Sequence, residues 1–191
     1  MSHPQVGVIH GRFQPVHLGH MEYLLAGKNK CDLLIVGIAN PDPVLTKENA
    51  ADPSRSLATS NPFTYYERML MIRDSLLESG VPRREFEIVP FPINNPEIIC
   101  QYVPMRARFF VTVYDEWGRS KVATLRALGV DVEIMWERDK LDRITTGDEI
   151  RKLIACGGRW QQLVPREVAS LVEANSWDLR FRKPGATDHD G

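Results

Sequence analysis

Two histidines stand three residues apart in the segment GRFQPVHLGH, residues 11–20. The apolar run VGVIH directly before it, residues 6–10, favours a buried strand, and apolar residues at helical spacing follow it. His17 and His20 would then lie on one face of a helix start. Imidazoles can donate hydrogen bonds to phosphate oxygens, and the unpaired backbone N–H groups of a helix start attract the same anions. The segment predicts a phosphate site.

The glycines of this segment favour a close approach of phosphate to the backbone. Gly11 permits a tight turn after the strand, and Gly19 leaves no side chain between a phosphate and the helix start. A single histidine in a sequence is more often an ordinary, partly exposed side chain than a ligand-binding group. The ten-residue pattern between a strand and a helix is what favours function.

The rest of the chain alternates strand and helix patterns. Strands are expected at residues 6–10, 32–39, 86–91, 108–114 and 130–136. Helices are expected at residues 18–30, 64–80, 119–129, 147–157 and 165–175, with a short helix around 95–103. This alternation predicts a Rossmann-like α/β fold, a doubly wound five-stranded parallel sheet with C-terminal helices. The ligand site of such a sheet lies at the carboxyl ends of its strands.

A single domain accounts for the length of 191 residues. It is expected to span residues 1–177, with an insertion at 40–63 that is rich in proline and small polar residues. Loops of this length usually carry function or are disordered. Residues 178–191 are polar, and we expect them to form a frayed tail.

Composition excludes several classes of protein. A net charge of −1 gives no reason to expect nucleic acid or a membrane surface as a partner. Cys31, Cys100 and Cys156 lie far apart with no CxxC spacing, which argues against a disulfide framework or a zinc site and suits a reducing cytoplasm. No signal pattern and no apolar run long enough to span a bilayer is visible. We therefore expect a cytoplasmic protein.

The segment GRFQPVHLGH resembles the HxGH signature of the nucleotidyltransferase superfamily, in the form found in nicotinamide mononucleotide (NMN) adenylyltransferases of the archaeal type. Three further segments resemble motifs of that family in the same order. They are NPFTYYERMLMIRDSLLESGVP at 61–82, PINNPEIICQYV at 92–103 and DRITTGDEIRKLI at 142–154. The likeness extends over most of residues 6–175.

The resemblance implies a reaction in which an acceptor oxygen attacks the α-phosphorus of a nucleoside triphosphate in line and pyrophosphate leaves. No covalent enzyme intermediate is formed, so catalysis consists mainly of positioning and charge stabilisation. The resemblance also implies Mg²⁺ bridging the triphosphate, with no metal ligand assigned to the protein itself.

Catalytic roles are implied for His17, His20 and Arg151. A lone helix arginine is more commonly solvated, and it is the motif around Arg151 that favours a functional role. Nucleotide contacts are implied for Gly11, Arg12, Phe13, Gln14, Gly19, Thr145, Thr146 and Gly147. Asp148 departs from the family, because it stands where a phosphate-contacting hydroxyl is expected. A carboxylate there would repel phosphate unless it turns away or faces Mg²⁺.

Further departures fall on segments that face the acceptor. Pro92 and Ile99 stand where NMN enzymes carry an aspartate and a tryptophan that stacks on the pyridine ring. The family's arginine before NPFT is missing, and the long insertion carries Lys47 and Arg55 instead. The acceptor residues expected from this pattern are Lys47, Arg55, Asn94, Asn95 and Ile99. The phosphate motifs are kept, so the pattern favours an altered acceptor.

The function expected is transfer of a nucleotidyl group from CTP or ATP to a small phosphate or phosphonate, as in a cytidylyltransferase of phosphonate biosynthesis. An NMN adenylyltransferase making NAD is the alternative. A non-catalytic nucleotide sensor on the same scaffold is an alternative of another class, although a sensor would not need both histidines and both motif arginines. Homo-oligomer formation stays open.

Overall fold

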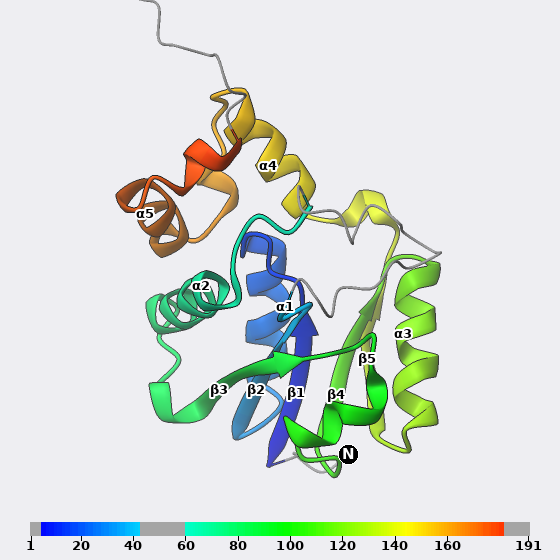
Figure 1. The fold of residues 1–191 in the computed structure, drawn as a ribbon. Helices are drawn as coiled ribbons and strands as arrows, with labels where there is room; N and C mark the ends of the chain where they lie inside the picture. Colours follow the sequence, from blue (N-terminus) through cyan, green and yellow to red (C-terminus); the bar gives the residue numbers. More distant parts are fainter. Residues whose placement is uncertain (1–4, 43–59, 182–191) are drawn as a thin grey trace, which may run out of the picture.

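A parallel five-stranded sheet forms the centre of the computed structural model, which describes residues 5–42 and 60–181. In chain order the strands are β1 (Val6–Gly11), β2 (Leu33–Ala39), β3 (Phe86–Phe91), β4 (Arg108–Val113) and β5 (Asp131–Glu137). They lie side by side in the order β3-β2-β1-β4-β5 (Figure 1). The fold class and all five predicted strands are confirmed. The order changes direction between β1 and β4, and ligands of such sheets bind at that switch point.

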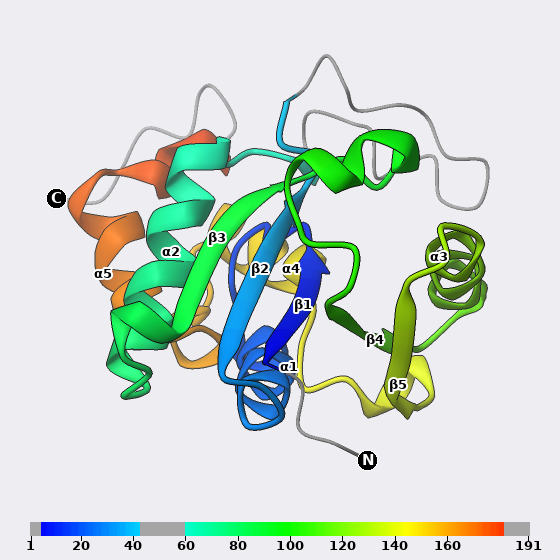
Figure 2. The ribbon, with the colours of Figure 1, turned by 90° about the horizontal axis from the view of Figure 1, so that it is seen from below.

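Helices cover both faces of the sheet (Figure 2). One face packs against α1 (Leu18–Lys28) and α2 (Tyr65–Glu78), and α3 (Glu116–Ala127) packs against the other. Neighbouring residues of β1 point to opposite faces of the sheet. Ile9 belongs to the core on the side of α1 and α2, and Val8 to the core on the side of α3. A strand buried on both sides in this way reads as a continuous apolar run.

The C-terminal helices α4 (Gly147–Ala155) and α5 (Arg166–Ala174) extend the core on the side of α1 and α2. Ile150 and Ile154 of α4 and Val168 and Val172 of α5 are buried in it. The C-terminal helices predicted from the sequence therefore share one hydrophobic core with α1 and α2.

Side-chain caps fix where the helices begin. Thr64 caps α2 and forms a capping box with Glu67. The start of α3 differs from the prediction, which placed it at residue 119. Asp115 accepts a hydrogen bond from the backbone N–H of Gly118 at 2.9 Å, so the helix begins at Glu116. The short helix expected around 95–103 is a 3-10 helix, Pro96–Gln101.

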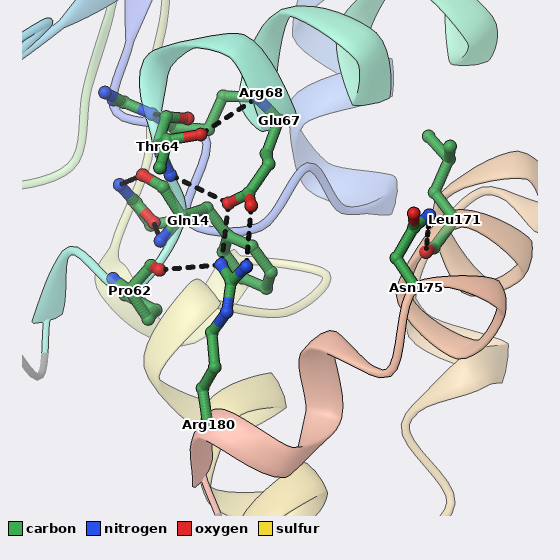
Figure 3. Close-up of polar contacts among 9 residues, drawn as sticks. Gln14, Pro62, Thr64, Glu67, Arg68, Leu171, Asn175 and Arg180 are labelled. Carbon is green, nitrogen blue, oxygen red and sulfur yellow. Dashed lines mark hydrogen bonds and ion pairs between the residues drawn. The ribbon is translucent and has the colours of Figure 1, made fainter.

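The described chain ends in a 3-10 helix, Trp177–Phe181, and so the polar tail expected from residue 178 is ordered at least to 181. Figure 3 shows why: the guanidinium of Arg180 binds both carboxylate oxygens of Glu67, at 2.6 and 2.7 Å. It also donates to the backbone oxygen of Pro62 at 3.1 Å. The end of the domain is thereby joined to the start of α2. Within residues 5–42 and 60–181, no helix has the length and apolar character that a membrane span requires.

Candidate active site

A cavity of about 440 Å³ opens at the carboxyl ends of β1, β2 and β4. It is bordered by two helix starts, that of α1 after β1 and that of α4 near the C-terminal end of the domain. Of the site residues predicted from the sequence, the structure brings the following to this cavity: Gly11, Arg12, Phe13, Gln14, His17, Gly19, His20, Asn94, Thr145, Thr146, Gly147 and Arg151. The two phosphate motifs, far apart in sequence, therefore border one space.

The histidine pair is stacked. The ring centroids of His17 and His20 lie 3.6 Å apart with an interplanar angle of 26°. His17 is the N-cap of α1, because its Nδ1 accepts the backbone N–H of His20 at 3.2 Å. A neutral imidazole that accepts through Nδ1 carries its proton on Nε2. His17 therefore has an N–H donor available for a phosphate oxygen.

Both histidines are neutral in the folded protein at pH 7. Burial lowers the pKa of His17 from 6.5 to about 3, with further lowering by the charges of Arg143 and Arg151. Burial likewise lowers the pKa of His20 well below its usual range, and the nearby His17, Arg12 and Arg143 act in the same direction. The arginine charges that lower these pKa values also favour binding of an anion, because an anion would offset the repulsion among the positive groups.

The second phosphate segment is the start of α4. Thr146 caps the helix by accepting the backbone N–H of Glu149 at 3.2 Å. Gly147 follows it, and a Cβ there would lie 2.7 Å from the backbone oxygen of Gln14. The start of α4 can approach the β1–α1 loop this closely only with glycine at that position. Asp148, the departure from the family motif, pairs with Lys152 at 2.8 Å, and half or more of its side chain is exposed.

Arg151 is not a solvated helix arginine. It is buried, and its Nη1 donates to the backbone oxygen of Gln14 at 2.6 Å. Its Nη2 lies 3.4 Å from a carboxylate oxygen of Asp148. Burial lowers the pKa of Arg151, while the Asp148 charge raises it. The guanidinium borders the cavity and joins α4 to the first phosphate loop at the same time.

The side chain of Gln14 has a supporting role. Its amide donates to the backbone oxygen of Phe63 and accepts from the backbone N–H of the same residue, both at 2.9 Å. Gln14 thereby fixes the NPFT segment against the β1–α1 loop. Arg68, from the same segment, donates to the backbone oxygens of Arg12, Ala39 and Asn40. One buried guanidinium thus holds the ends of β1 and β2 where they border the cavity.

Only some of the residues predicted to bind the acceptor lie at the cavity. Asn94 lines the cavity, with its Nδ2 3.4 Å from Oδ1 of Asn40. Asn95 is not among the lining residues, and its buried Oδ1 has no partner among the described residues. Ile99 is fully buried in the core beneath and does not reach the cavity, so it offers an acceptor no contact. Lys47 and Arg55 lie outside the described residues.

Several lining residues escaped the sequence analysis, namely His10, Asn40, Tyr114, Trp117, Lys121 and Arg143. Arg143 stacks over the ring of Tyr114 at 4.5 Å and lies 3.4 Å from a carboxylate oxygen of Asp115. Its place within DRITTGDEIR could have revealed it. The others come from the ends of strands and from α3.

Carboxylates near the cavity are already paired with cations. Glu22 pairs with Arg138 at 2.8 Å, and Asp115 pairs with Lys140 at 3.4 Å. In the part of the chain that the structure describes, no group of three or more histidine, cysteine or acidic residues is arranged to hold a metal ion.

Comparison with known proteins identifies the family of this chain. A family model described as cytidylyltransferase-like matches residues 8–154. A phosphonoformate cytidylyltransferase from Streptomyces viridochromogenes is 51% identical over 176 residues, covering 92% of this chain and 95% of that protein. A nicotinamide-nucleotide adenylyltransferase from Thermococcus onnurineus is 36% identical over 174 residues, covering 89% of this chain and 83% of that protein.

Among solved structures, a bifunctional NMN adenylyltransferase/ADP ribose pyrophosphatase from Francisella tularensis, complexed with AMP and a manganese ion, matches with a TM-score of 0.63. The sequence identity is 13%, and the match covers 93% of this chain and 52% of that one. At this identity the match shows the fold. The fold and the relatives together define a Rossmann-like nucleotidyltransferase, an enzyme. The chain belongs to the cytidylyltransferase-like family.

Proposed function

We propose that this enzyme transfers a cytidylyl group from CTP to a small phosphonate, with phosphonoformate as the first acceptor to test, and releases pyrophosphate. The observation that carries the proposal is the 51% identity, over nearly the whole of both chains, to a phosphonoformate cytidylyltransferase. The site agrees with it, because two helix starts and several cations border a cavity of about 440 Å³. Such a site suits a triphosphate and a small anion.

In the proposed reaction a phosphonate oxygen of the acceptor attacks the α-phosphorus of CTP. A new P–O bond forms there, and the bond to the bridging oxygen of the β-phosphate breaks, so that pyrophosphate takes the electron pair. The attacking oxygen is already anionic, and no general base is required. His17 and His20 would donate to the oxygens around the α-phosphorus, where charge is redistributed in the transition state.

The leaving pyrophosphate would lie at the start of α4. Backbone N–H groups after Thr146, together with Arg151 and Arg143, supply positive charge there. Mg²⁺ carried by the triphosphate would neutralise part of its charge and draw electrons from the leaving group. The paired state of Glu22 and Asp115 supports an ion held chiefly by phosphate oxygens and water.

Adenylyl transfer to NMN is the second candidate, because nicotinamide-nucleotide adenylyltransferases from two Thermococcus species are 36% and 34% identical to this chain over most of its length. The acceptor side argues against it. Ile99 stands where those enzymes are expected to stack a pyridine ring, and it is buried in the core. An acceptor with a flat aromatic ring would lose that stacking partner.

Pyrophosphate release by the purified enzyme distinguishes these functions. CTP and ATP are each tested with phosphonoformate and with NMN, in the presence of Mg²⁺. Turnover of CTP with phosphonoformate supports the proposal, and efficient turnover of ATP with NMN would replace it with NAD synthesis. Nucleotide binding by calorimetry without turnover of any pair would instead indicate a sensor. A His17→Ala, His20→Ala double variant is the control for contaminating activity.

A further inference from the structure

His10 is a buried histidine that takes no part in the proposed reaction. It is the penultimate residue of β1, only 5% of its surface is exposed, and it is one of the residues that line the cavity. Neither Nδ1 nor Nε2 has a hydrogen-bond partner among the described residues. Buried polar groups are almost always paired within the protein or with a bound molecule, so an imidazole without a protein partner beside a cavity is notable.

The fold holds this imidazole in a defined orientation. Its ring stacks on Phe91, with 4.6 Å between centroids and an interplanar angle of 15°. Gly37 lies opposite His10 in the parallel register of β1 and β2, and a Cβ there would lie 2.7 Å from Cβ of Phe91. The missing side chain of Gly37 therefore leaves room for Phe91 to reach His10. An apolar residue at position 10 would fill the same space at a smaller desolvation cost.

His10 lies apart from the phosphate groups. Phe91, on which it stacks, belongs to the core on the α3 side of the sheet. The ring of His20 instead contacts Phe13, which belongs to the core on the α1 side. The end of β1 thus separates a phosphate side of the cavity, with His17 and His20, from a second side with His10. Asn94 of the INN segment and Lys121 of α3 line the same cavity.

The chemistry of this second side suits a small anionic group. Burial lowers the pKa of His10 well below its usual range, and the charge of Lys121 lowers it further, so the ring is neutral and offers one N–H donor. The ammonium of Lys121 supplies the positive charge. A carboxylate can accept a hydrogen bond from the first group and pair with the second.

We propose that His10, together with Lys121, is the specificity-determining site for a carboxylate on the acceptor, while the reacting phosphonate of the same molecule faces His17 and His20. The inference rests on the proposed function and narrows it, because it selects phosphonates that carry a carboxylate. His10 would take no part in bond making. Its role is to distinguish acceptors.

The test compares two acceptors that share a phosphonate and differ in the carboxylate, phosphonoformate and methylphosphonate. The full-length enzyme is assayed with CTP and Mg²⁺ as wild type, His10→Leu, His10→Gln and Lys121→Met. His10→Leu should lower kcat/KM for phosphonoformate about ten- to a hundredfold, the loss expected for a hydrogen bond to a charged group. The KM for CTP and the rate with methylphosphonate should stay at their wild-type values. His10→Gln keeps an N–H donor and should recover part of the preference, and Lys121→Met should lose part of it.

The melting temperature distinguishes this role from a purely structural one, because replacing a histidine that stabilises the fold would lower the melting temperature. Because the imidazole has no partner, His10→Leu should melt at or above the wild-type temperature in the absence of ligands. Val8→Ala, on the same face of β1, is the matched control. It should lower the melting temperature and leave the preference between the two acceptors unchanged.

Two results would overturn the inference while leaving the proposed function intact. One is an unchanged preference for phosphonoformate in His10→Leu, and the other is an equal loss with both acceptors. A wild-type enzyme that turns over CTP with neither acceptor would instead refute the proposed function, and this inference with it.

Discussion

Nη1 of Arg151 donates to the backbone oxygen of Gln14 at 2.6 Å, across 137 positions of sequence. This contact joins the start of α4 to the loop between β1 and α1, and both segments border the cavity. The arginine of the second phosphate segment thus determines where the first one lies. Arg151 therefore supports the loop that carries the histidine pair, and in the proposed mechanism it also contacts the phosphates of the nucleotide.

Replacing Arg151 separates these roles. Arg151→Ala should raise the KM for the nucleotide, lower kcat and lower the melting temperature, because it leaves the Gln14 carbonyl unpaired and removes a phosphate contact. Arg151→Lys keeps the charge and loses the planar fork, so it should recover nucleotide affinity better than kcat. Steady-state kinetics with each substrate varied in turn measures both. A defect confined to the KM of the acceptor would contradict the role given to this residue.

His17→Ala and His20→Ala should each reduce kcat strongly without unfolding the protein. Loss of one donor to the transition state costs about 3 kcal/mol, or roughly a hundredfold in rate. His17→Ala also removes the N-cap of α1 and should lower the melting temperature more than His20→Ala does, by the equivalent of about 1 kcal/mol. His17→Asn, which can still cap the helix, is the control for that second effect. Near-normal turnover in both alanine variants would remove the phosphate-site assignment.

Stability should fall in mild acid. The pKa values of His10, His17 and His20 lie well below 6.5 in the folded protein, chiefly because of burial. The unfolded chain therefore binds protons that the folded chain does not, and stability, fully present above pH 6.5, is lost as the pH falls below that value. Between pH 7 and pH 5 His17, whose pKa is lowered to about 3, should cost about 2 kcal/mol, and His10 and His20 should act in the same direction.

Urea unfolding at a series of pH values measures this effect. His10→Leu removes one of the three histidines without touching the phosphate side, so its stability should decline less between pH 7 and pH 5. A wild-type curve that is flat in this interval would show that the three imidazoles titrate normally. Saturating CTP should also reduce the decline, since its phosphates favour protonation of His17 and His20.

Arg68 should be required for a well-formed site although it binds no substrate in the proposed mechanism. It is buried and donates to the backbone oxygens of Arg12, Ala39 and Asn40 at 2.8–3.0 Å. Arg68→Lys cannot reach all three carbonyl groups, so it should lower kcat and melting temperature together. Arg73→Lys, on the same helix but paired only with Asp74 among the described residues, is the matched control and should behave as wild type. Normal kcat in Arg68→Lys would show that the strand ends hold their positions without it.

Lys47 and Arg55 remain a prediction from the sequence. If they supply charge to the acceptor, Lys47→Gln with Arg55→Gln should raise the KM of the acceptor and leave that of the nucleotide unchanged, because each lost charge-assisted hydrogen bond weakens binding of a small anion. Lys152→Gln, a cation exposed on α4, serves as the control for a general change in charge. Equal KM values in the double variant and wild type would exclude the insertion cations from the acceptor site.

Local patterns determined the fold and the phosphate side of the cavity. Apolar periodicity marks a strand or helix within a few residues, and the segments at 11–20 and 142–154 place their histidines and arginines at helix starts. These are short-range relations along one chain, and a sequence displays them directly. Thr64 illustrates this, since the residue and its partner Glu67 are three positions apart.

Contacts between distant segments were decided by the tertiary structure. Ile99 is buried because the 3-10 helix Pro96–Gln101 packs onto the core, and nothing within that segment reveals which side faces in. Gln14 was expected to contact the nucleotide, yet its amide is bound to Phe63, 49 positions away. His10 looked like the last residue of an apolar strand until the sheet placed it between Phe91 and the cavity. These residues meet their partners only after the strands have paired in register and the helices have packed on the sheet. The order of residues along the chain does not reveal that pairing.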